Sequence, residues 1–98
     1  MQKQRNSLKM KLQKLAIDHW WLSGYASGKA SHYKGDWKEA EKMTLRSERT
    51  DDRLKYLMGV LDSVGVDVDR VLASAEYNRG WNEGKEDIER LMSGIKAA

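Results

Sequence analysis

Five basic residues near the amino terminus are the candidates for binding an anionic partner. They are Lys3, Arg5, Lys9, Lys11 and Lys14, and residues 1–17 contain no acidic residue. Basic side chains bind phosphate backbones because they release the counterions condensed there. Further along, aromatic residues are interleaved with lysines over residues 20–38, a mixture typical of surfaces that stack unpaired bases. The sequence leaves open whether this basic segment meets nucleic acid or an acidic protein surface.

Residue groupings typical of catalysis or metal binding are missing from the sequence. The chain has no cysteine, and its two histidines, His19 and His32, have no third ligand at a suitable spacing. Residues 24–29 superficially match a phosphate-binding loop, but they have three residues rather than four between the glycines, and an alanine follows the lysine. No serine, histidine and acid can be grouped into a triad. We therefore expect a protein that is not an enzyme and that uses no metal or cofactor.

A repeated pattern of aromatic residues and glycines predicts how two helices pack. Residues 21–29 and 77–85 both read aromatic-x-x-Gly-aromatic-x-x-Gly-Lys, and they lie 56 positions apart. A glycine inside a helix costs about 1 kcal/mol relative to alanine, so a compensating interaction is required. Close approach of two helix backbones is such an interaction, because small residues permit it. The residues predicted at this crossing are Gly24, Gly28, Gly80, Gly84, Tyr25, Tyr77 and Trp81.

The elements that must position these residues are all predicted to be helices. Apolar spacing and turn residues predict four of them, over residues 8–33, 37–47, 52–63 and 68–95, with Ser7, Asp36 and Asp67 as N-caps. The polar residues 47–52 are predicted to form a link. The chain contains no proline, which suits helices joined by short connections. The expected fold is an all-α bundle of about four helices, a single domain over residues 1–98 with a basic, flexible tail at residues 1–7.

The first helix is predicted to be covered on two sides. One apolar stripe consists of Leu8, Leu12, Leu15, His19, Leu22, Ala26, Ala30 and Tyr33, and nearly opposite lie Met10, Ile17, Trp21, Gly24 and Gly28. A helix with two apolar faces is usually sandwiched. One neighbour is the rest of the chain, whereas the other can be a further part of the bundle, a second copy or a partner protein. Large apolar faces mark interfaces, and Trp21, Tyr33 and Trp37 are the predicted partner contacts.

Helix length bears on the shape of the molecule. The first and last helices would each be about 40 Å long at about 1.5 Å per residue. That is long for a compact chain of 98 residues, so the helices break, the molecule is elongated, or it forms a homodimer. No run of about 18 apolar residues exists, so no membrane-spanning helix is expected. The absence of cysteine favours the cytoplasm.

One segment carries a resemblance to known proteins. Residues 76–88 read Glu-Tyr-Asn-Arg-Gly-Trp-Asn-Glu-Gly-Lys-Glu-Asp-Ile, and this segment resembles one common in small helical proteins encoded by phages and prophages. The resemblance covers 13 of the 98 residues and transfers no functional residue. It implies an accessory role, such as inhibition of a host nuclease or defence complex. The predicted function is therefore non-enzymatic occupation of a host protein complex, with nucleic-acid binding by the basic amino-terminal helix as the alternative.

Overall fold

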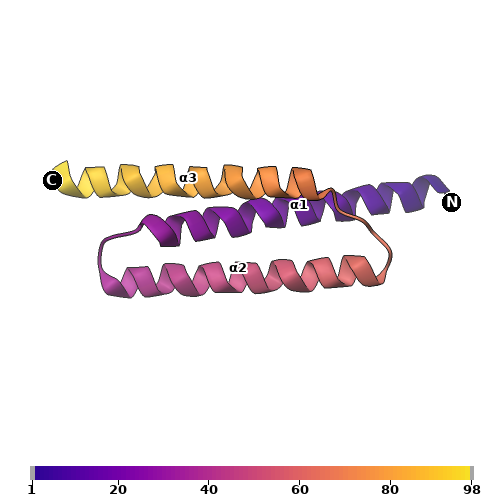
Figure 1. Cartoon of the computed structure of the whole chain (residues 1–98), viewed down its shortest axis with the longest axis horizontal. Coiled ribbons are helices and arrows are strands. Elements are labelled where there is room, and N and C mark those ends of the chain that lie inside the picture. Colours follow the sequence, from indigo (N-terminus) through magenta and orange to yellow (C-terminus); the bar gives the residue numbers. More distant parts are fainter. Residues whose placement is uncertain (1, 98) are drawn as a thin grey trace.

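Three long helices make up the computed structural model, which describes the backbone of residues 2–97 and the side chains of residues 7–94. They are α1 (Gln2–His32), α2 (Trp37–Ser63) and α3 (Arg70–Ala97). Helix α1 lies in the middle, with α2 and α3 along opposite sides (Figure 1). Over the described residues, α2 and α3 have no Cα atoms within 8 Å of each other. The prediction that the first helix is sandwiched is confirmed, and both covering helices belong to this chain.

The predicted count of four helices is wrong, because residues 37–47 and 52–63 belong to the single helix α2. The polar stretch between them contains neither glycine nor proline, so nothing in it prevents helical dihedral angles. Its serine and threonine stay helical, and the Thr50 hydroxyl donates to the Ser47 carbonyl oxygen at 2.9 Å. Thr50 is also buried in the fold. Polarity alone therefore does not end a helix whose other residues form helices readily.

The helix ends differ from the predicted caps at two places. Helix α1 begins at Gln2, so Ser7 lies inside it as an exposed residue and residues 2–7 are helical instead of forming a tail. The N-cap of α3 is Asp69 instead of Asp67: its carboxylate accepts hydrogen bonds from the backbone N–H groups of Val71 and Leu72 at 3.0 and 3.2 Å. Helix α2 begins after Asp36 as predicted, although the Asp36 side chain makes no capping hydrogen bond.

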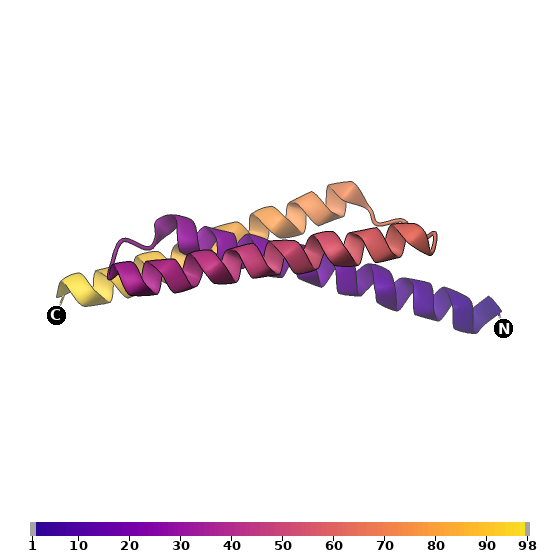
Figure 2. The same cartoon turned by 90° about the horizontal axis from the view of Figure 1, so that it is seen from below.

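The chain runs in the same direction along α1 and α3, and the two helices cross where their glycines lie (Figure 2). A Cβ atom added at Gly24 would overlap the Tyr77 carbonyl oxygen, and one at Gly28 would overlap that of Trp81. The reverse contacts join Gly80 to the Trp21 carbonyl and Gly84 to that of Tyr25. A shift of 56 positions converts each contact into its counterpart, so the two repeats meet as if related by a two-fold axis. Residues without side chains are what permit this approach.

The molecule is elongated and has a thin core. Its extents are 59 × 19 × 19 Å, and its radius of gyration is 16.4 Å, whereas a compact chain of this length has about 13 Å. Its accessible surface is 7248 Å², whereas a compact protein of 11.3 kDa exposes roughly 5,700 Å². Among the side chains of residues 7–94, the buried apolar ones are Ala16, Ala26, Leu54, Leu61, Ala73 and Ile88. Three helices in a layer therefore leave about 1,500 Å² of additional surface in contact with solvent.

Within the part of the chain that the structure describes, no helix combines the length and the apolar character that a bilayer crossing requires.

Candidate partner-binding surface

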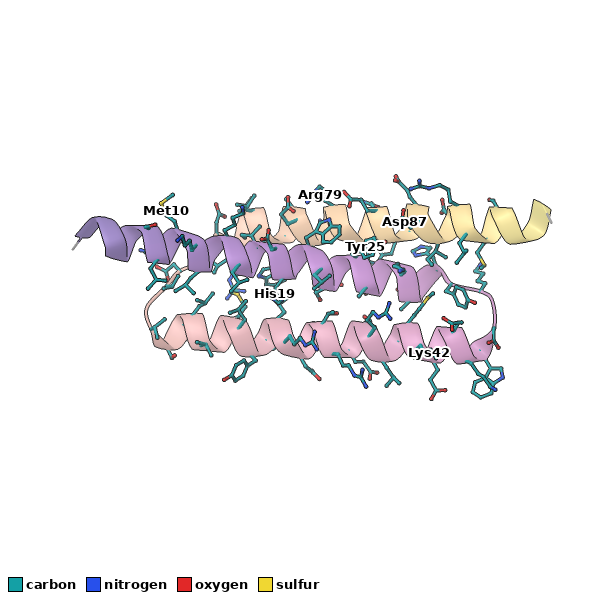
Figure 3. All side chains as sticks on the ribbon, turned by 180° about the vertical axis from the view of Figure 1, so that it is seen from behind. Met10, His19, Tyr25, Lys42, Arg79 and Asp87 are labelled. Atoms are coloured by element: carbon teal, nitrogen blue, oxygen red, sulfur yellow. The ribbon has the colours of Figure 1, made fainter. Side chains whose placement is uncertain are left out.

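One side of the α1–α3 crossing is closed by two aromatic rings of α1. The Trp21 and Tyr25 rings stack with their centroids 5.0 Å apart. The Trp21 indole N–H donates to the Glu83 carboxylate at 3.2 Å, and the Tyr25 hydroxyl donates to the Asp87 carboxylate. Figure 3 shows Tyr25 and Asp87 meeting between the two helices. The hydrogen bond to Asp87 raises the pKa of Tyr25, and burial and nearby carboxylates raise it further. Both rings therefore contribute to the packing of α1 against α3.

The opposite side of the crossing is closed by aromatic residues of both helices. The Tyr77 ring meets Trp20 edge-on at 6.3 Å between centroids, and the Trp81 ring meets His32 in the same way at 4.7 Å. The His32 Nδ1 atom lies 2.8 Å from the Gly28 carbonyl oxygen, so this nitrogen carries the proton. His32 therefore packs against the crossing and has no metal-binding arrangement around it. Across the described residues, no group of three histidines, aspartates or glutamates is placed to hold a metal ion.

The three predicted partner contacts lie in two different places. Trp37 is exposed at the start of α2, with the Lys38 ammonium 5.8 Å from the centre of its ring. Tyr33 is half-buried at the end of α1, and its hydroxyl lies against Gly35 in the connection to α2. Trp21 is half-buried in the α1–α3 crossing, where the Arg79 guanidinium lies 5.7 Å from its ring centroid. Tyr33 and Trp37 flank one connection, whereas Trp21 packs mainly within the fold.

The basic amino-terminal segment is part of the projecting end of α1 (Figure 1). The side chains of Lys3 and Arg5 lie outside the described residues. Lys9, Lys11 and Lys14 are exposed, and none of them forms an ion pair with a side chain among residues 7–94. At 3.6 residues per turn, Lys11 and Lys14 share a side of the helix and Lys9 lies across from Lys11. These cations therefore surround α1 instead of forming one surface.

A second basic surface, which was not predicted from the sequence, runs along α2. We call it the α2 basic stripe; it consists of Lys38, Lys42, Arg46, Arg49 and Arg53. Their spacings of 4, 4, 3 and 4 place all five on one side of a continuous helix. Lys42 pairs with Glu39 at 3.3 Å, whereas the three arginines form no ion pair with any side chain of residues 7–94. The spacing of these five residues is visible in the sequence. The break predicted at residues 47–52, however, placed them on two separate helices and a link.

A groove lies where the α2 basic stripe meets α1. A hollow of about 190 Å³ is lined by Leu22, Tyr25, Ala26, Lys29, Met43, Arg46 and Thr50. A second hollow of about 480 Å³ is lined by Leu22, Lys42, Leu45, Arg46, Arg49, Thr50 and Arg53. Leu22, Arg46 and Thr50 line both, so the two hollows form one groove along α1 and α2. We call it the α1–α2 groove; its lining combines exposed apolar side chains with five cations and no carboxylate.

The charges on α3 are arranged differently. Arg79 contacts both Glu76 and Glu83 at 2.7 Å, and Arg90 contacts Asp87 at 2.8 Å. The hydrogen bond from Arg79 holds the pKa of Glu76 below its ordinary value. Exposed pairs of this kind contribute little to stability, but they neutralise the arginines locally. Arg79 and Arg90 of α3 are therefore paired, in contrast to the arginines that line the α1–α2 groove.

Comparison of the chain with protein-family models, with curated proteins and with solved structures finds no significant match.

Proposed function

We propose that this chain is a non-enzymatic protein that binds a macromolecular partner by presenting its open side surface. The observation that carries the proposal is the surplus of surface, about 1,500 Å² more than a compact monomer of this mass exposes. In a complex of ordinary size each protein covers about 800 Å² of its own surface. The surplus is therefore large enough to hold a partner.

Apolar exposure supports the same proposal. Twelve large apolar side chains among the described residues are 38–81% exposed, including Leu8, Met10, Trp37 and Leu45. Because α2 and α3 pack only on α1, the sides of α1 between them are left partly uncovered. Adjoining exposed apolar side chains mark sites of protein association, and Leu22 and Leu45 line the same hollow between α1 and α2. The same proposal includes a phage-type inhibitory or accessory role, which the resemblance of residues 76–88 implies, and a cytoplasmic location, which the absence of cysteine favours.

Affinity purification from the source cell tests this function. The tagged chain should retain one protein in about equal molar amount, and the purified pair should reassemble into a complex whose mass light scattering can measure. Light scattering of the chain alone provides the control, because a homodimer could cover the same surplus surface. The proposal fails if no protein is retained in stoichiometric amount.

Nucleic-acid binding through the amino-terminal segment is the second candidate. Lys9, Lys11 and Lys14 favour it, because they are exposed on the projecting end of α1 and form no ion pair with the side chains that the structure describes. The binding constant of such a complex falls steeply as the salt concentration rises. On a double-logarithmic plot of the two, the slope is about −0.9 for each phosphate of duplex DNA that is neutralised. Reversal of these three charges should abolish a mobility shift measured at low salt. The absence of any shift with the unmodified chain would eliminate this candidate.

A further inference from the structure

The lining of the α1–α2 groove has a definite chemistry. Leu22, Ala26 and Met43 supply apolar surface, and the exposed Leu45 lies at its outer edge. The cations that line it are Lys29, Lys42, Arg46, Arg49 and Arg53. An occupant that fits must bring apolar side chains for the first group and negative charges for the second.

The charges of α2 are divided between its two sides. One acid, Glu39, lies beside the α2 basic stripe, and it is paired with Lys42. The other acids of the helix before its last turn follow a different side at helical spacing, and they are Glu41, Glu48, Asp51 and Asp52. Arg46, Arg49 and Arg53 therefore have no carboxylate partner among the described residues and give the groove a net positive charge.

We propose that the α1–α2 groove binds an amphipathic helix of a partner protein whose apolar stripe is flanked by aspartates or glutamates. This inference rests on the proposed function and specifies the chemistry of the partner. Lys42 and Arg53 are separated by 11 positions, or about 17 Å along a helix, which matches roughly three turns of a docked helix. Apolar side chains three and four positions apart would meet Leu22 and Met43, as in other helix-in-groove complexes. Carboxylates beside them would meet the arginines, which pair with carboxylates through two parallel hydrogen bonds.

The lining favours a protein helix over nucleic acid. Binding of unpaired bases uses exposed aromatic faces. The aromatic residue that lines this groove is Tyr25, and Trp21 already stacks on its ring while the Lys29 ammonium lies 5.2 Å from its centroid. A phosphate backbone gains nothing from the exposed Leu22 and Leu45. Apolar and cationic groups in one groove match an occupant that has both apolar and anionic groups.

A peptide titration tests the inference with a defined probe. The probe is a fluorescent peptide of about four helical turns, built from Leu, Glu, Ala and Gln, with leucines every three or four positions and glutamates beside them. A peptide of the same composition with the leucines redistributed around the helix is the control probe. The striped peptide should bind at least about tenfold more tightly than the control in fluorescence anisotropy, because only it presents a continuous apolar face.

Two charge-reversed proteins locate the binding. Arg46→Glu/Arg49→Glu/Arg53→Glu should weaken binding of the striped peptide at least about tenfold. Lys34→Glu/Lys55→Glu/Arg70→Glu changes the net charge equally and should weaken it less than about twofold, because these exposed residues lie outside the groove. Leu22→Ser should also weaken binding, and circular dichroism with a thermal melt verifies that each variant remains folded. Single-stranded DNA is the competing probe.

The outcomes separate this inference from the proposed function. Equal binding of both peptides, insensitivity to the arginine reversals, or no binding of the striped peptide overturns the inference. So does DNA binding that depends on Arg46, Arg49 and Arg53 and displaces the peptide. The proposed function is judged independently by affinity purification: a stoichiometric partner that the arginine-reversed chain still retains would refute the groove and leave the proposed function intact.

Discussion

The contact at Gly24 shows how a single missing side chain sets the α1–α3 distance. An added Cβ would meet the backbone of Tyr77, which cannot rotate away as a flexible side chain could. The cost of overpacking, about 1–3 kcal/mol, should exceed the gain of about 1 kcal/mol in helix propensity. Gly24→Ala should therefore lower the thermal midpoint, by about 5 °C or more for a net loss near 1 kcal/mol.

Gly59 provides the matched control for this substitution. It also lies inside a helix, but an added Cβ would have no neighbour within 4 Å. Gly59→Ala should therefore raise the thermal midpoint, because only the propensity gain remains. Equal responses of the two variants in a melting experiment would show that the crossing is not as close as described.

Tyr25 predicts how stability changes at alkaline pH. Its pKa is raised above the ordinary value of 10.0 by the hydrogen bond to Asp87, by burial and by nearby carboxylates. The folded state favours the neutral phenol. The resulting contribution to the free energy of unfolding is therefore complete below about pH 10 and is lost as the pH rises through the higher pKa of the folded state. Tyr25→Phe should lower the free energy of unfolding by about 1 kcal/mol near neutral pH, because the hydrogen bond to Asp87 is missing. Between neutral and alkaline pH, the free energy of unfolding should then fall less for this variant than for the unmodified chain. Urea titrations at several pH values measure both effects, and an unchanged alkaline slope would contradict them.

At the scale of elements, the continuity of α2 has a direct test. Glu48 lies in the stretch that the sequence analysis predicted as a link, where proline would be tolerated. Inside a continuous helix, Glu48→Pro should cost about 3 kcal/mol or more. Asp36→Pro is the control, because Asp36 has φ −56° and its side chain makes no capping hydrogen bond. Circular dichroism and thermal melts should show a large loss for the first and little change for the second; two equally tolerated prolines would favour a divided helix.

Sequence patterns predicted the all-helical fold and the sandwiching of α1 more reliably than the helix ends. Apolar spacing is a strong signal because it reflects burial, but it did not predict that Leu8, Met10 and Leu15 of the two α1 stripes stay exposed. Residues 47–52 were predicted as a link because they contain few apolar residues. A helix can nevertheless continue through them, since only Thr50 is buried there. The same error hid the α2 basic stripe. The α1–α2 groove was not predictable, since it depends on which faces of the two helices pack.

At the scale of the whole molecule, the three long helices predict an elongated particle. A compact globular chain of this number of residues would have a radius of gyration of about 13 Å, against 16.4 Å for the Cα atoms here. Small-angle X-ray scattering with an on-line light-scattering detector separates the shape of a monomer from dimerisation. A monomer with an extended distance distribution is expected. A monomer with a radius of gyration near 13 Å would contradict the elongated arrangement.

The exposed surface of such a layer connects the shape with the proposed function. Closing the layer into a bundle would bury part of Leu22 and Leu45, and the structure instead leaves them exposed at 38% and 44%. A partner can cover these apolar side chains, which α2 and α3 leave exposed because they do not contact each other over the described residues. The glycine crossing thus holds α1 against α3 while the α1–α2 groove stays open.

Photo-cross-linking in the source cell tests most directly whether this chain works by holding a protein partner. A photoreactive amino acid replaces Leu45, at the edge of the α1–α2 groove, or Lys55, an exposed residue outside it. We predict that the probe at position 45 links the chain to one protein and that the probe at position 55 does not. Cross-links to nucleic acid alone, or no cross-linked product from position 45, would contradict the account.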